Sequence, residues 1–149
     1  MKKFAIILVI LLLCCAALSL SACKHEDVVV TIGEKSFVLE LADTKAAQEL
    51  EKALPLTVKM TSVNGQYVHG NVNSATFTQQ LAESGVLDMG DIMLQGNNEL
   101  MLFYSVNTSN DMLTRIGRIT QDERTAFANA IVKALQSSTT ITIKISKGA

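Results

Sequence analysis

The residues with the most specific chemistry stand together at Leu20-Ser21-Ala22-Cys23. Two lysines, Lys2 and Lys3, precede an apolar run over residues 4–20, and the run ends in two small residues followed by the cysteine. A thiolate is nucleophilic enough to accept a lipid group, and small neighbours give a protease access to the bond before the cysteine. The arrangement therefore predicts a secretory signal peptide.

These four residues resemble the bacterial lipobox, in which the cysteine sulfur receives a diacylglycerol and the new amino group is acylated, for example with palmitate. The resemblance implies that residues 1–22 are a lipoprotein signal peptide and that Cys23 is the lipidation site. It also implies a protein that is lipid-anchored in the bacterial cell envelope and faces outside the cytoplasm. The alternative is an uncleaved anchor, because the 19 residues from Phe4 to Ala22 are just long enough to cross a bilayer.

The cysteines, charges and histidines of the remaining chain exclude several classes of function. Cys14 and Cys15 lie in the predicted signal and Cys23 carries lipid, so no disulfide, thiolate metal site or cysteine nucleophile is expected. The 127 residues from Cys23 onward hold 11 Lys and Arg against 14 Asp and Glu, a formal charge of −3 that does not favour nucleic acid. His25 and His69 stand 44 positions apart, so neither a metal nor another cofactor is expected.

After a short polar tether at residues 23–27, the chain follows alternating patterns that are typical of β-strands. We expect strands within residues 28–41, 56–61, 91–104, 116–119 and 141–145. The segment Leu100–Tyr104 is apolar on both faces, which predicts a central strand or the floor of an apolar cleft. The polar segments 66–86 and 107–111 are expected to be loops, the first with a helical turn at 76–83.

Two segments change to a helical period. The first runs from Thr44 to Leu54, with Asp43 as the expected N-cap and Pro55 as the residue that stops it. The second is expected to open on a capping box at residues 120–123 and to end near residue 135. We therefore expect a mainly β domain over residues 28–147 with two helices, folded as a small β-barrel, because closure removes sheet edges that would otherwise aggregate.

Several motifs in this order resemble a bacterial cyclophilin-like family, over nearly the whole segment from Val28 to Ile145. They are Leu54-Pro55-Leu56-Thr57, Asn64-Gly65, Gly90-Asp91-Ile92-Met93-Leu94, Leu102-Phe103-Tyr104 and Thr114-Arg115-Ile116-Gly117-Arg118-Ile119. The resemblance implies a cyclophilin-like β-barrel with a helix at each end.

The resemblance does not imply prolyl isomerase activity. Cyclophilins place an arginine just ahead of a Phe-Met-x-Gln-x-Gly-Asp stretch, where it weakens amide resonance across a barrier of about 18 to 20 kcal/mol. This chain has no such stretch, and Gln95-Gly96 resembles it only weakly. We therefore lean against an enzyme, and assign no catalytic residue.

Five residues are the candidates for ligand binding: Arg115, Phe103, Tyr104, Tyr67 and His69. Arg115 lies in the family-like motif, and its alternative role is structural, bonded to loop carbonyls or to an acidic neighbour. His69 and Tyr67 are expected to form an aromatic pair in a loop, and the alternative for His69 is an exposed histidine without a function.

These observations predict a membrane-anchored lipoprotein that binds a peptide or a small molecule without covalent chemistry. Two alternatives remain, a weak peptidyl-prolyl isomerase and an accessory subunit of a membrane complex. The ligand and the oligomeric state are not defined by the sequence.

Overall fold

The computed structural model describes residues 26–80 and 85–149. The strands are β1 (Val28–Ile32), β2 (Lys35–Leu41), β3 (Leu56–Val63), β4 (Tyr67–Asn71), β5 (Gly85–Leu87), β6 (Asp91–Gln95), β7 (Glu99–Phe103), β8 (Asn107–Ser109), β9 (Thr114–Ile119) and β10 (Thr140–Lys147). The helices are α2 (Lys45–Ala53) and α3 (Arg124–Leu135). Among the described residues, neither helix has the length and apolar character needed to span a membrane.

Eight of the strands close into one antiparallel barrel, in the order β1-β10-β3-β4-β7-β6-β9-β2. Alternate residues of these strands point inward, as in β10, where Ile141, Ile143 and Ile145 are buried and the residues between them are exposed. The expected fold class is confirmed: the domain is mainly β, carries two helices in the described part and forms a closed barrel.

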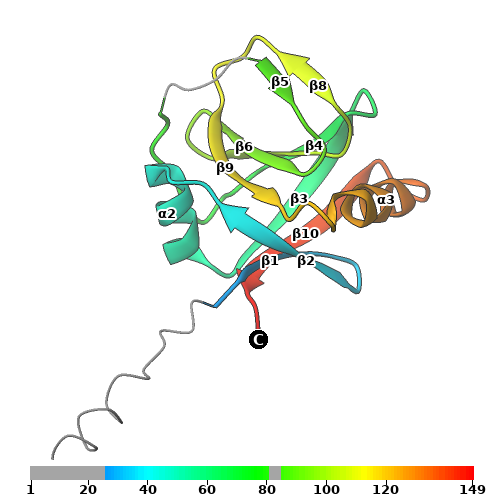
Figure 1. Ribbon diagram of the computed structural model, residues 1–149, viewed down its shortest axis with the longest axis horizontal. Helices are drawn as coiled ribbons and strands as arrows, with labels where there is room; N and C mark the ends of the chain where they lie inside the picture. Colours follow the sequence, from blue (N-terminus) through cyan, green and yellow to red (C-terminus); the bar gives the residue numbers. More distant parts are fainter. Residues whose placement is uncertain (1–25, 81–84) are drawn as a thin grey trace, which may run out of the picture.

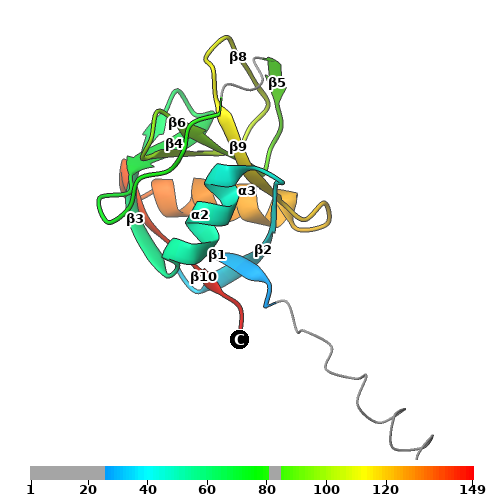
Figure 2. The same cartoon turned by 90° about the vertical axis from the view of Figure 1, so that its left-hand side faces the viewer.

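The two helices cover opposite ends of the barrel, with α2 nearest the viewer and α3 at the far opening (Figure 2). Helix α2 buries Ala46, Ala47 and Leu50 against the barrel core. Its N-cap is Thr44, whose hydroxyl accepts the N–H of Ala47 at 3.2 Å, and not Asp43 as the sequence predicted. The hydroxyl also donates to the carbonyl of Arg115, so a tertiary contact on β9 favours threonine at the cap.

Helix α3 begins at Arg124, three residues later than the expected capping box requires, and ends at Leu135 as predicted. The carboxylate of Glu123 forms no hydrogen bond that caps the helix. It accepts the N–H of Val38 at 2.7 Å and the hydroxyl of Thr120 at 2.9 Å, and so fastens the start of α3 to β2. The predicted capping box is therefore wrong, because the N–H of Val38 binds the carboxylate that would have capped the helix.

Two segments that were expected to be loops are strands. β4 is held by pairing with both β3 and β7, and its Val68 is fully buried in the barrel. β8 pairs with β5 as a small separate sheet on the outside of the barrel (Figures 1 and 2). The expected helical turn is absent from residues 76–80, where Glu49 instead accepts the N–H and hydroxyl of Thr78, and its remainder lies outside the described residues.

The apolar side chains form two separate cores. The inner core fills the barrel, and an outer apolar cluster lies on the opposite face of β6 and β7. The outer apolar cluster comprises Leu87, Met93, Met101, Phe103 and Leu113, with Tyr67 packed against it. β7 is therefore a central strand, as its sequence predicted, and it is apolar on both faces because each face is buried in a different core.

Gly117 marks a close approach of β9 to β2, because a Cβ at this position would collide with the backbone carbonyl oxygen of Glu40. We expect Gly117→Ala to lower the free energy of unfolding by about 1 to 3 kcal/mol, the usual cost of overpacking. Urea denaturation followed by circular dichroism measures the change. Gly148→Ala is the control, since the nearest atom to its added Cβ is 3.2 Å away at the chain end. Equal stability of the two variants would contradict the close approach.

Candidate functional site

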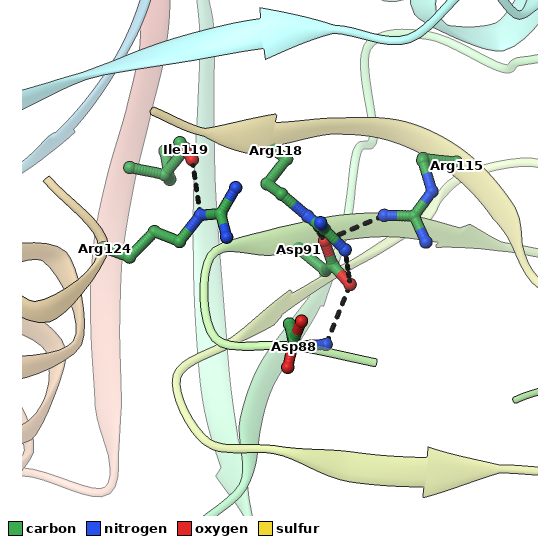
Figure 3. A network of polar contacts seen from close by, with 6 residues as sticks. All are labelled: Asp88, Asp91, Arg115, Arg118, Ile119 and Arg124. Carbon is green, nitrogen blue, oxygen red and sulfur yellow. Dashed lines mark hydrogen bonds and ion pairs between the residues drawn. The ribbon is translucent and has the colours of Figure 1, made fainter. Parts of the chain in front are cut away.

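A buried carboxylate with two arginines lies on the outer face of β6 and β9. Asp91 is fully buried, and its Oδ1 accepts a hydrogen bond from Nη1 of Arg115 at 2.8 Å. Its two oxygens also accept from Nε and Nη2 of Arg118, the latter at 2.9 Å. The N–H of Asp88 donates to Oδ2 at 2.9 Å. Figure 3 shows the two guanidinium groups converging on this one carboxylate, and we call these contacts the Asp91 network.

A β-bulge brings both arginines to the same face of the sheet. Arg115 and Arg118 are three residues apart, so in a regular strand they would point to opposite faces. The register of β9 against β6 shifts at this place: Met93 pairs with Arg115, whereas Ile92 pairs with Gly117. The additional residue in β9 turns both guanidinium groups toward Asp91.

The charges around Asp91 keep its carboxylate ionised. Burial by itself raises the pKa of Asp91, but the hydrogen bond from Arg118, the N–H of Asp88 and the positive charges of Arg115 and Arg118 lower it by more. The net result is a pKa below the ordinary value of an aspartic acid. The site therefore carries a fixed negative charge beneath two positive ones.

The two arginines reach the surface, although their partner does not. The side chain of Arg115 is 25% exposed and that of Arg118 is 33% exposed. Arg124 lies beside them at the start of α3 and donates to the carbonyl of Ile119 at 3.0 Å (Figure 3). The three arginines together form the basic rim of the candidate site.

The aromatic candidates lie on the other side of the outer apolar cluster. Tyr67 and His69 stand on β4, and their ring centroids are 6.2 Å apart. The expected pair is therefore present, but it lies on a strand and not in a loop. Nδ1 of His69 contacts Oε1 of Glu99 on β7, and the ring of Tyr67 lies 5.1 Å from that of Phe103.

The structure does not bring the aromatic pair and Arg115 together. His69, Met101, Met93 and Arg115 occupy facing positions on four neighbouring strands. Three strand spacings of roughly 4.8 Å separate the ends of this row by about 14 Å. The two methionines between them are buried, so the row is not an open cleft.

Phe103 and Tyr104 point to opposite sides of the barrel wall. Phe103 belongs to the outer apolar cluster, whereas Tyr104 lies in the inner core with its hydroxyl 2.8 Å from Oγ of Ser62. Consecutive strand residues alternate between faces, so Leu102, Phe103 and Tyr104 do not form a single floor. Both aromatic side chains are buried, so neither offers its ring to a ligand at the surface.

Sequence reasoning missed Asp91 and Arg118 as site residues. The available signal was an aspartate inside an otherwise apolar strand, because a buried carboxylate requires a positively charged partner. The residue types of β9 do not reveal the β-bulge that brings a second arginine to Asp91. Among the described residues, no three histidine, cysteine, aspartate or glutamate side chains are grouped to hold a metal ion.

Comparisons with known proteins agree with this architecture. The model of a family described as the cyclophilin-like family matches residues 30–144. The solution structure of the hypothetical protein AF2241 from Archaeoglobus fulgidus is similar with a TM-score of 0.54 and 14% identity, over 83% of this chain and 95% of that one. The structure of McbB in complex with tryptophan is similar with a TM-score of 0.52 and 7% identity, over 82% of this chain and 45% of that one. No curated protein matches the chain significantly.

We expect Asp91→Asn to lower the free energy of unfolding at neutral pH by about 1.5 to 3 kcal/mol, the range for a hydrogen bond to a charged group, since the partly exposed arginines can be rehydrated. Because the pKa of Asp91 is lower in the folded state, its contribution is complete above the ordinary pKa of aspartate, about 3.9. This contribution to stability is lost as the pH falls toward the pKa of Asp91 in the folded protein.

The measurement is urea denaturation of both proteins at several pH values between neutrality and the acid range. The stability difference between the unmutated protein and Asp91→Asn should shrink as the pH falls below about 4. A difference that stays constant down to low pH would show that Asp91 is not stabilised as an anion.

Proposed function

The chain belongs to the cyclophilin-like family, and we propose that it is a lipid-anchored module of the bacterial cell envelope that binds a peptide or a small molecule without catalysing a reaction. In this proposal, residues 1–22 are removed as a signal peptide and Cys23 carries the lipid. The ligand contacts are the exposed parts of Arg115 and Arg118, with Tyr67 and His69 as a separate second contact.

The anchor is supported by the order of residues at the start of the chain. An apolar run ends in Leu20-Ser21-Ala22-Cys23, and β1 begins at Val28, only five residues after Cys23. A tether of this length holds the domain close to the membrane surface. Attachment through two or more acyl chains is stable, whereas a single chain binds only marginally.

Binding is supported by one observation, the Asp91 network. A buried anion holds two arginines in fixed positions while leaving a quarter to a third of each side chain exposed. A guanidinium has five N–H groups, so each arginine can bind Asp91 and other acceptors at the same time. Donors that are fixed in advance lose little entropy when they bind a carbonyl or carboxylate of a ligand.

The same observation disfavours prolyl isomerase activity. That reaction needs an arginine beside an open apolar pocket for the proline ring. Here Met93, which faces Arg115 across β6 and β9, is fully buried in the outer apolar cluster. Arg115 in addition forms an ion pair with Asp91, which offsets part of the positive charge of the site.

We expect Cys23→Ala to abolish fatty-acid labelling and to leave the precursor uncut by the lipoprotein pathway, because no other residue accepts the lipid. Metabolic labelling with radioactive palmitate in the bacterial host, followed by gel electrophoresis, measures the incorporation. Cys14→Ala is the matched control and should label normally. Retained labelling of Cys23→Ala would refute the lipid anchor.

We expect Arg115→Ala to weaken peptide binding by about 1 to 3 kcal/mol, the usual cost of losing a charge-assisted hydrogen bond. Peptides are first selected from a panel of proline-containing peptides by the unmutated protein, and their affinities are then compared by calorimetry. Lys144→Ala is the control, since Lys144 lies at an exposed position of β10 and takes no part in the Asp91 network. Thermal unfolding verifies that both variants are folded.

The unmutated protein should leave the isomerisation of a succinylated Ala-Ala-Pro-Phe anilide near its uncatalysed rate. A rate well above background that is lost in Arg115→Ala would make the protein an isomerase. Unchanged peptide affinity in Arg115→Ala would remove the arginine from the binding site.

A further inference from the structure

A second candidate site lies between α3 and the turn that joins β1 to β2. Figure 1 shows these two elements on the same side of the barrel. The cavity there has a volume of about 400 Å³, within the range of about 300 to 1,000 Å³ that ligand pockets occupy. We call it the helix–hairpin cavity. Its lining residues are Ile32, Gly33, Glu34, Lys35, Asn129, Ala130, Lys133 and Ala134.

Small residues on both walls leave this space open. Gly33 adopts a φ of +60° in the tight turn, a conformation that glycine accepts readily, and no atom lies within 4 Å of where its Cβ would be. Ala130 and Ala134 are one helical turn apart on α3, so they line the same face of the helix. Ile32, which is buried, forms the apolar floor.

The polar groups at the rim carry a net positive charge. Lys35 comes from β2 and Lys133 from α3, so the two amines approach the cavity from opposite walls. Neither forms an ion pair with any carboxylate of the described residues, in contrast to Lys147, which binds Glu51. Glu34 is the single carboxylate among the lining residues. One further anion would balance these charges.

We propose that the helix–hairpin cavity binds a small organic carboxylate with an apolar body. The carboxylate lies between the ammonium groups of Lys35 and Lys133, and the apolar body packs on Ile32, Ala130 and Ala134. The amide of Asn129 is one helical turn from Lys133 and offers a further hydrogen bond. An apolar floor with a few convergent polar groups is the usual composition of a small-molecule site.

This site shares no residue with the Asp91 network, so it is independent of the proposed function. The probe is 3-phenylpropionate, and 3-phenylpropionamide is the uncharged molecule of the same shape. The full chain in detergent micelles, with carbon-13 methyl labels on isoleucine and alanine, is titrated with each compound after dialysis. The methyl signals of Ile32, Ala130 and Ala134 report binding.

We expect saturable shifts of these three methyl groups with the carboxylate, and an affinity at least tenfold weaker for the amide. The double substitution Lys35→Gln and Lys133→Gln should weaken carboxylate binding at least fivefold. Lys144→Gln, on the exposed face of β10, is the matched control and should leave it unchanged. Arg115→Ala should also have no effect, which separates this site from the Asp91 network.

Filling the cavity gives a second test that does not depend on charge. Ala134→Leu should abolish the shifts of Ile32, whereas Ala126→Leu, the same change at an exposed position of α3, should retain them. The proposal is overturned by the absence of a saturable shift, by an amide that binds as well as the carboxylate, or by less than a fivefold loss in the double lysine variant. Binding that survives Ala134→Leu would likewise place the ligand elsewhere.

Discussion

The ion pairs of one buried carboxylate fix the outer face of this barrel. Asp91 stands at the start of β6, where it joins the preceding turn to β9 through the N–H of Asp88 and the guanidinium groups of Arg115 and Arg118. A buried charge is costly unless partners surround it, so the strand, the turn and the bulge must all be in place together. The positions of the two arginines follow from this requirement.

The same requirement connects stability with binding. Arginines that were free to move would lose side-chain entropy on binding a ligand, whereas arginines held by Asp91 lose little. The outer apolar cluster occupies the face between these arginines and Tyr67, which separates the two parts of the candidate site. The barrel thereby offers polar contacts at this part of its surface and keeps the side chains of the outer apolar cluster buried.

The sequence predicts those parts of the fold in which periodicity and burial agree. β10 alternates cleanly, and β7 is apolar on both faces because it lies between two cores. β4 and β8 were missed because their stability comes from pairing with distant strands and not from their own polar residues. Tertiary contacts override local preference in such cases.

The candidate site was predicted only in part for a related reason. Arg115 was identified from its motif, but its approach to the carboxylate that Arg118 faces directly depends on the bulge at Ile116. The caps of the helices show the same effect: Thr44 and Glu123 are selected by contacts with β9 and β2, which no local pattern reveals.

The most direct measurement of this account is the titration of the Asp91 side chain itself. Carbon-13 NMR of the aspartate carboxyl carbons, assigned by comparison with Asp91→Asn, follows its ionisation in the folded protein. We expect Asp91 to remain ionised to a pH below the ordinary aspartate pKa of about 3.9. A carboxyl that titrates at or above that value would show that the arginines do not hold a buried anion, and would contradict the account.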